Sequence, residues 1–314
     1  MTTSGSVDFS VSRDNIIADA LGLVGGLDVG GTVTSAQTTH SARFLNMIVK
    51  AWQSKGIQLW ARKTGYILPV SATNSVSLGA SGGHATLSYT QTTLAAAVAD
   101  GASTITVASA TGISNGYYIG IEQDDGTMHW TTVNGAPSGT TVTLTAAVTE
   151  DCESGDYVYV YQTKLQRPIR IVEAYIHDQS TSVDTWVEVA AKSKYDSYAN
   201  KIHEGSPIIC SYDPQLDNGV FYFAPRFDDG RELFIVIFQR PFEDFDATGD
   251  TPDFPSEAYL ALTYGLATVL APTYGLPVQD RALLKAEAKE YFDLFASNEP
   301  EEGSLEIQPD VRPE

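Results

Sequence analysis

Cysteine is scarce in this chain, which argues against two classes of protein: small domains held together by several disulfides, and proteins that bind a metal ion through cysteines. The 314 residues contain only Cys152 and Cys210, which can form at most one disulfide bridge. Neither has a neighbouring Cys or His at the spacing by which one turn presents two metal ligands. We therefore expect two buried free thiols, no metal ion and no cofactor.

Long hydrophobic runs are also missing, although the chain has enough apolar residues to build real cores. Hydrophobic residues make up 43% of the sequence, yet no run reaches the roughly 18 apolar residues that suggest a membrane-spanning helix. The first residues carry neither a basic segment nor an apolar stretch, so we expect no secretory signal. These absences predict a soluble protein that is made in a cytoplasm and does not contact a membrane.

Basic residues are few in comparison with acidic ones. The 19 Lys and Arg residues stand against 39 Asp and Glu residues, which gives a formal net charge of -20. This balance argues against a protein that clamps phosphates in a basic groove. It is compatible with DNA passing by, because a surface that repels phosphate lets DNA move without adhering.

Motifs that carry chemistry are either absent or lack their structural context. The stretch Gly79-Ala80-Ser81-Gly82-Gly83 fits the G-x-S-x-G pattern, but its Ser/Thr/Gly-rich flanks favour a flexible linker over a nucleophile elbow. The five histidines are scattered, and Asp124-Asp125-Gly126 is better explained by a hairpin turn than by a calcium loop. The sequence thus predicts no catalytic, cofactor-binding or metal-binding residue, and no enzyme.

Helical periodicity is present at both ends of the chain. Apolar side chains recur at three- and four-residue spacing, and Leu283 and Leu294 are expected to face inward in the last helix. Because a helix cannot bury an apolar stripe alone, we expect the two ends to pack together. Four helices are expected: from Ser12 to Val24, from Ser35 to Ser54, from Pro255 to Ala271 and from Val278 to Phe295.

Between the helices, alternation of apolar and polar residues predicts strands. A first group, with a hairpin turn at Asp125-Gly126, indicates a small antiparallel barrel or sandwich. A second group ends in 233–238, which is apolar on both faces as expected of a covered central strand. The Ser/Thr/Gly/Ala-rich segment 74–93 has no period and is interpreted as a connection. The predicted strands are 104–107, 118–121, 142–145 and 157–161 in the first group and 169–172, 186–189, 220–223 and 233–238 in the second.

The predicted fold class is α+β, with a helical bundle formed by the N- and C-terminal helix pairs. An inserted antiparallel β-barrel or sandwich module and a further β-rich region complete it. The expected domains are a helical body of 1–65 and 250–297, an extended linker of 66–100, the inserted β module of 101–163, a β-rich region of 164–249 packed on the body, and an acidic flexible tail of 298–314.

Two parts of the chain resemble the head-to-tail adaptor (connector, or tail tubular-type) proteins of short-tailed bacteriophages. The first is the run from Phe44 to Trp60, FLNMIVKAWQSKGIQLW, in which a helix is followed by an Ile-x-Leu-Trp exit. The second comprises 239–246, 253–259 and 266–275. The resemblance covers about the first 65 residues and the span from about 165 to 297. The inserted β module resembles modules of phage structural proteins, and compact adaptors lack it.

The resemblance implies a helical-bundle subunit of a virion, synthesised in the host cytoplasm and placed at the head–tail junction. It implies a homo-oligomeric ring of about twelve copies between the portal protein and the tail nozzle protein. Such a ring would retain packaged DNA, provide an ejection channel that DNA crosses without specific binding, and attach tail components. Residues assigned to inter-subunit contact in the ring or to packing within the subunit are Phe44, Ile48, Trp52, Trp60, Phe245, Phe254, Tyr264 and Tyr274; those assigned to a portal-docking tail are Glu301, Glu302, Leu305, Ile307 and Val311.

Two other functions remain open at this point. The aromatic residues of the β module, among them Tyr117, Trp130 and Tyr159, could hold a tail fibre or a receptor glycan. Some adaptor relatives are credited with peptidoglycan cleavage. We identify no residue in this sequence to which such a cell-wall hydrolase activity could be assigned.

Overall fold

The computed structural model describes residues 5–6, 8–28, 30–54, 59–70, 73–227 and 230–297. Its contacts divide the chain into two compact units. Unit 1 is formed by the two ends of the chain, Met1–Ala61 and Phe242–Glu314, and unit 2 is the continuous segment Arg62–Pro241.

Unit 1 is helical, and its helices begin where the sequence provides caps. Helix α1 (Arg13–Leu23) starts after Ser12, whose side chain accepts a hydrogen bond from the backbone amide of Asn15. Helix α2 (Ser35–Gln53) starts with a capping box between Thr34 and Gln37. The other helices are α4 (Tyr259–Leu270) and α5 (Val278–Ser297), with short 3₁₀ turns η1 (Leu59–Ala61) and η2 (Ser256–Ala258).

The end of α1 is fixed by two glycines. Gly25 has a φ of 67°, a conformation that glycine adopts without strain, and the amide of Gly26 donates to the carbonyl of Leu21 at 2.8 Å. A Cβ on Gly26 would lie 2.6 Å from the ring of Tyr274. Gly26 therefore both ends the helix and lets the ring pack against the backbone.

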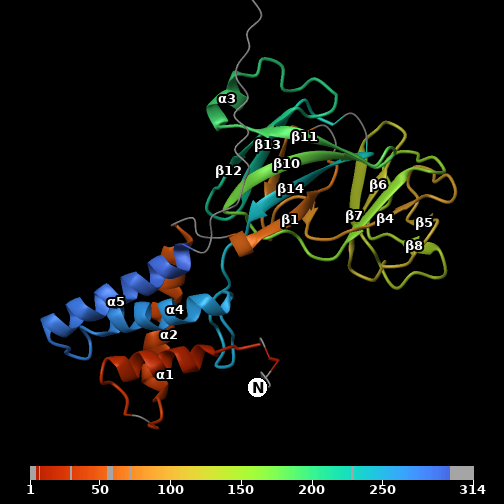
Figure 1. Cartoon of the computed structure of the whole chain (residues 1–314). Helices are drawn as coiled ribbons and strands as arrows, with labels where there is room; N and C mark the ends of the chain where they lie inside the picture. The colour runs from red at the N-terminus through yellow and green to blue at the C-terminus, as the bar shows by residue number, and fades with distance from the viewer. Residues whose placement is uncertain are drawn as a thin grey trace, which may run out of the picture. The chain divides into compact units, whose positions relative to one another are not determined.

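The helices of unit 1 share one hydrophobic core. Helix α4 contacts α1, α2 and α5, and it lies between α1 and α5 (Figure 1). Trp60 stacks on Phe242 at a ring-centroid distance of 5.7 Å, and both Trp52 and Trp60 contact Phe254 and Phe295. Segments about 200 positions apart in the sequence, such as Asn46 and Phe245, are joined by hydrogen bonds.

The main feature of unit 2 is an eight-stranded sheet with the order β2-β13-β12-β11-β10-β14-β1-β3. Its two end strands follow each other in the chain, so the sheet nearly closes into a barrel. Phe221, Phe223 and Phe234 fill its interior, and a short helix α3 (Lys192–Ser197) contacts β12 and β13. The strands are β1 (Arg62–Ile67), β2 (Ser75–Leu78), β3 (Ala85–Thr86), β10 (Arg170–Asp178), β11 (Val183–Val189), β12 (Ile209–Asp213), β13 (Gly219–Ala224) and β14 (Glu232–Gln239).

An inserted module, residues 90–161, forms the rest of unit 2. It contains a four-stranded sheet of order β4-β9-β6-β7 and the pair β5-β8, with a core that includes Ile119, Val142 and Val158. The turn at Asp125-Gly126 joins β6 to β7, as predicted. The strands are β4 (Thr90–Thr93), β5 (Thr104–Thr106), β6 (Tyr118–Glu122), β7 (Met128–Thr132), β8 (Thr141–Thr143) and β9 (Tyr157–Tyr161).

The predicted fold class is wrong. A helical bundle with inserted β parts was expected, but the described chain is mostly β, and a nearly closed eight-stranded sheet is its main feature. The four helices form at the predicted positions, within a few residues. The error arose because strands β1, β2, β3, β4, β7 and β12 were not recognised, which left the sheets too small in the prediction.

The interpretation of 74–93 as a connection that takes no part in a core is also incorrect. Strands β2 and β3 close the two ends of the large sheet, and β4 pairs with β9 in the inserted module. Val76, Leu78 and Ala85 are buried there. These strands have two to four residues each, and β4 consists of threonine and glutamine alone, so the alternation in Ser75–Leu78 was too short to distinguish a strand from a connection.

The described residues contain neither a membrane-spanning helix nor a cluster of metal ligands. None of their helices combines the length and the hydropathy that a bilayer-spanning segment requires. Within the same ranges, no three side chains of His, Cys, Asp or Glu gather as metal ligands.

Candidate assembly surface

The eight residues assigned to ring packing lie together in unit 1, but mainly inside it. Phe245 and Phe254 are buried in the core of the unit. The other six, Phe44, Ile48, Trp52, Trp60, Tyr264 and Tyr274, are partly buried and pack against the same core. The indole nitrogen of Trp60 donates to the carbonyl of Asp253 at 3.2 Å. Their main contacts are therefore within the subunit, and only their remaining exposed edges are available to another chain.

Different apolar side chains are exposed on unit 1. Leu283 and Leu294 were expected to face inward, but they are 63% and 61% exposed. They are eleven residues apart, which is close to three helical turns, so both lie on one side of α5. Leu284 and Phe295 occupy the buried side of the same helix. The exposed large apolar residues of unit 1 are Phe9, Leu23, Met47, Leu260, Val269, Val278, Leu283 and Leu294.

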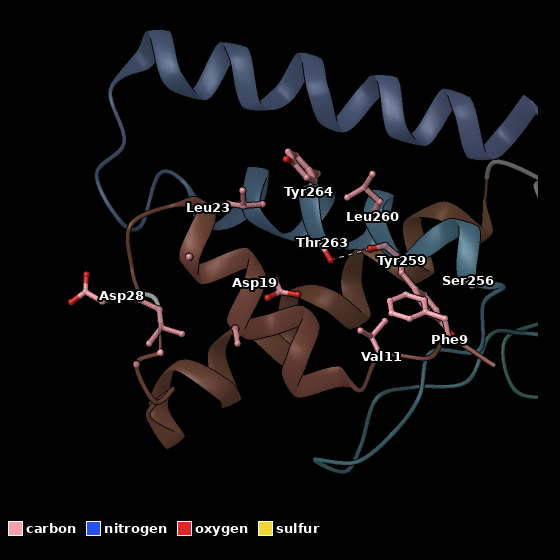
Figure 2. A pocket seen from close by; sticks show the side chains of 15 residues that line it. Phe9, Val11, Asp19, Leu23, Asp28, Ser256, Tyr259, Leu260, Thr263 and Tyr264 are labelled. Atoms are coloured by element: carbon pink, nitrogen blue, oxygen red, sulfur yellow. Dashed lines mark hydrogen bonds between the residues drawn. The ribbon is translucent and has the colours of Figure 1, made fainter. Parts of the chain in front are cut away.

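A groove continues this apolar surface between α1 and α4. It has a volume of about 730 Å³. Figure 2 shows Leu23 and Asp19 on α1, Leu260 and Tyr264 on α4, and the ring of Phe9 near Tyr259. The Phe9 and Tyr259 ring centroids are 6.2 Å apart. The groove therefore offers a largely apolar surface that includes the carboxylates of Asp19 and Asp28.

The aromatic residues assigned to a fibre or glycan contact mostly pack inside unit 2. Tyr159 is fully buried, and its hydroxyl donates to the carbonyl of Gly230 at 2.7 Å. The indole nitrogen of Trp130 donates to the carbonyl of Pro69 at 3.0 Å. Tyr117 packs against the core of the inserted module. Trp130 and Tyr159 thus hold the inserted module against the eight-stranded sheet, which leaves Tyr159 no surface for a partner.

His84 is a strongly perturbed titratable group of this packing. Its ring stacks on Trp130 at a centroid distance of 3.9 Å and an interplanar angle of 11°, and its Nδ1 lies 2.9 Å from the hydroxyl of Tyr161. Burial, and secondly the nearby Lys164 ammonium group, lowers the pKa of His84 from 6.5 to about 4. His84 is therefore a neutral packing residue near pH 7, and no carboxylate orients it as a base.

The two thiols are buried and separate. Burial raises the pKa of Cys152 to about 11, with nearby Asp156 and other aspartates adding to the effect, and burial raises that of Cys210 to about 12. Both are free cysteines, as predicted. Because the thiolate is the reactive form, neither cysteine has the properties of a nucleophile.

The turn that contains the G-x-S-x-G pattern lies between two strands of the large sheet. The amide of Gly82 donates to the carbonyl of Gly79, and the side chains of Ser81 and Asn218 are hydrogen-bonded at 2.9 Å. Strand β3 follows the turn, whereas a nucleophile elbow leads into a helix. Ser81 is therefore part of a turn that closes the sheet.

The residues assigned to portal docking, Glu301, Glu302, Leu305, Ile307 and Val311, lie outside the described residues. That assignment stays a prediction.

Comparison with known proteins gives little. No protein-family model matches the chain, and no curated protein matches it. Among solved structures, a match is found to the gp54 tailspike of Acinetobacter baumannii bacteriophage AP22 in complex with A. baumannii capsular saccharide, with 22% identity and a TM-score of 0.22. The match covers 25% of this chain and 15% of the tailspike chain. At this TM-score the match carries no argument about the function of this chain.

Sequence reasoning missed the exposed side of α5 and one exposed tryptophan on β11. In α5 apolar residues occur on both sides of the helix, so periodicity alone did not show which side is buried. For Trp186 a signal was present. The alternation of Trp186-Val187-Glu188-Val189 separates Trp186 and Glu188 from the two valines, and Val187 is the buried member.

Proposed function

We propose that the chain is a structural subunit of a phage virion, a head-to-tail adaptor that assembles into a ring through unit 1. The observation that carries the proposal is the apolar surface of unit 1, with its groove and the exposed side of α5. Large apolar side chains gathered on the surface of one unit mark candidate interaction sites. A groove on one side of a subunit and a helix face elsewhere on it suit a head-to-tail contact that closes into a ring.

The resemblance described from the sequence supports the same proposal. Its two parts, the run from Phe44 to Trp60 and the segments between 239 and 275, contribute to one core in unit 1. The shared motifs are therefore the residues that build the unit with the exposed apolar surface. Portal and nozzle proteins are the partners that this function requires, and the head–tail junction of the virion is the location that it requires.

The charge of the chain is consistent with a channel for DNA. A formal net charge of -20 gives a subunit that repels phosphate, so a ring of such subunits would let the genome pass without adhering. The pKa shifts of His84 and the two thiols are compatible with a structural role, because burial holds each of these three groups in its neutral form near pH 7. We propose no enzymatic activity.

The fibre or glycan-binding alternative has less support in the inserted module. Of the three residues assigned to it, Tyr159 is buried and Trp130 is held by Pro69 and His84. A receptor site in that module would need other residues.

The test is assembly of the full-length protein on its portal. A variant with Leu283→Asp and Leu294→Asp places charges on the exposed side of α5, where they cost the free subunit little stability. Leu216→Asp is the matched control, because Leu216 is 90% exposed and lies in unit 2. Electron microscopy and sedimentation should show rings on the portal for the wild type and for the control, but not for the α5 variant. Equal assembly of all three proteins, or none with the wild type, would contradict the proposal.

A further inference from the structure

Strand β11 of unit 2 has an edge that is open along part of its length. Residues 183–187 pair with β10 on one side. On the other side only Glu188 and Val189 pair with β12, and no described strand pairs with 183–187. Residues 183–186 are all exposed, so this part of the edge is open to solvent.

Backbone amides along the open edge point away from β10, where an added strand could accept their hydrogen bonds. The amide of Glu188 donates to the carbonyl of Ile208 on the β12 side at 3.2 Å. Amides that point to one side of a strand are two residues apart, so those of Asp184 and Trp186 point to that side too. An unpaired edge of this kind can accept a further strand, because the backbone hydrogen bonds of a sheet continue into any extended chain.

The side chains along the same edge have a distinct chemistry. Trp186 is 62% exposed, and its cross-strand partner is Tyr175 on β10. Asp184 and Glu188 are two residues before and after Trp186, so they lie on the same face of the sheet. The hydroxyl of Tyr175 donates to the carboxylate of Glu173 at 2.6 Å, which adds a third carboxylate beside the aromatic pair.

The nearby positive charges leave this face acidic. Lys194 lies 2.5 Å from the carboxylate of Glu188, and the Nδ1 of His177 lies 2.6 Å from that of Asp184. Each carboxylate has further lone pairs, and these two contacts do not neutralise all three acidic groups. An exposed indole with carboxylates on both sides is suited to arginine, whose planar guanidinium stacks on aromatic rings and pairs with carboxylates.

We propose that β11 binds an extended segment of a partner protein that adds a strand to the eight-stranded sheet and carries basic side chains at alternate positions. Those side chains would lie over Asp184, Trp186 and Glu188. The open backbone edge favours a polypeptide over a glycan, because a glycan cannot continue the hydrogen bonds of the sheet. A second copy of this chain that pairs through its own β11 is a poorer occupant, since it would bring the same carboxylates, Asp184 and Glu188, against each other.

The experiment uses the full-length protein and a short capped peptide in which arginine alternates with valine. Binding is followed by calorimetry and by tryptophan fluorescence. The affinity should fall at least about tenfold with Trp186→Ala, and by a similar factor at low salt with Asp184→Asn combined with Glu188→Gln. Trp186→Phe should retain part of the affinity. Leu216→Ala, at an exposed position outside β11, is the matched control and should bind as the wild type does.

Modified peptides separate the backbone contribution from the charge contribution. Two peptides are compared, each N-methylated at every second amide but in opposite registers. The peptide whose methylated amides face β11 should not bind, and the other should bind as the unmodified peptide does. A peptide in which glutamine replaces arginine should bind at least about tenfold more weakly. Equal binding of both methylated peptides, or of the glutamine peptide, would overturn the proposal. So would saccharide binding that Trp186→Ala abolishes, or self-association of the protein that Trp186→Ala abolishes.

Discussion

Acid should destabilise unit 2 through His84, and the effect can be worked out from the structure. Burial lowers the pKa of His84 from 6.5 to about 4. Below pH 6.5 the unfolded chain takes up a proton at this residue, while the folded protein keeps the ring neutral until about pH 4. The stabilisation is therefore fully present above pH 6.5 and is lost as the pH falls toward 4. At about 1.4 kcal/mol for each pKa unit, the complete loss is roughly 3 kcal/mol.

The assay compares the wild type with His84→Gln, which keeps a polar group near Tyr161 but cannot titrate. Hydrogen exchange of the β6 and β9 amides reports the free energy of opening of this sheet without a contribution from unit 1. Between pH 7 and pH 4.5 the wild type should lose roughly 2.5 kcal/mol more than the variant. Carboxylates also titrate in this range, but they titrate in both proteins, so the difference isolates His84.

The control is His203→Gln, because His203 is an exposed histidine of the same unit. It should lose stability with pH as the wild type does. If His84→Gln and the wild type lost the same free energy between the two pH values, the description of His84 as a buried, neutral ring stacked on Trp130 would be refuted.

Three further predictions follow from packing. Tyr159→Phe should lower the free energy of unfolding of unit 2 by about 1 to 3 kcal/mol in urea denaturation, because it leaves the buried carbonyl of Gly230 without its donor; an unchanged value would contradict that contact. Gly26→Ala should destabilise unit 1 by roughly 1 to 3 kcal/mol in thermal unfolding, because its Cβ would overlap the ring of Tyr274; a neutral effect would show that the ring moves freely. Both cysteines should resist iodoacetamide at pH 8 in the native protein and react in urea, as mass spectrometry would show; rapid native labelling would contradict their burial.

The helices could be predicted from the sequence because their signals are local. Ser12 and Thr34 cap the first two helices, and a cap is a feature of a few consecutive residues. The same holds for the hairpin at Asp125-Gly126, whose turn residues specify the connection directly. The sequence was sufficient to predict those elements whose structure is determined by a few consecutive residues.

The large sheet could not be predicted, because its edges depend on residues that are distant in the chain. Strand β2 forms by pairing with β13 about 140 positions later, and β3 pairs with β1. Strand β2, Ser75-Val76-Ser77-Leu78, alternates over only four residues, and β3 has two residues, so neither pattern is long enough to indicate a strand without its partners. The fold class was mistaken for that reason.

The candidate surfaces were harder still to predict, because exposure is a property of the folded unit. Leu283 and Leu294 look like core residues in the sequence, and only the packing of α5 through Leu284 and Phe295 shows that they face solvent. Trp130, by contrast, was assigned to a partner and is used within the unit.

The most direct test of the proposed function is hydrogen exchange of the protein before and after assembly on its portal. The α5 amides around Leu283 and Leu294, and those that line the groove between α1 and α4, should become protected when the ring forms. Protection confined to unit 2, with α5 exchanging as in the free subunit, would contradict assembly through the apolar surface of unit 1.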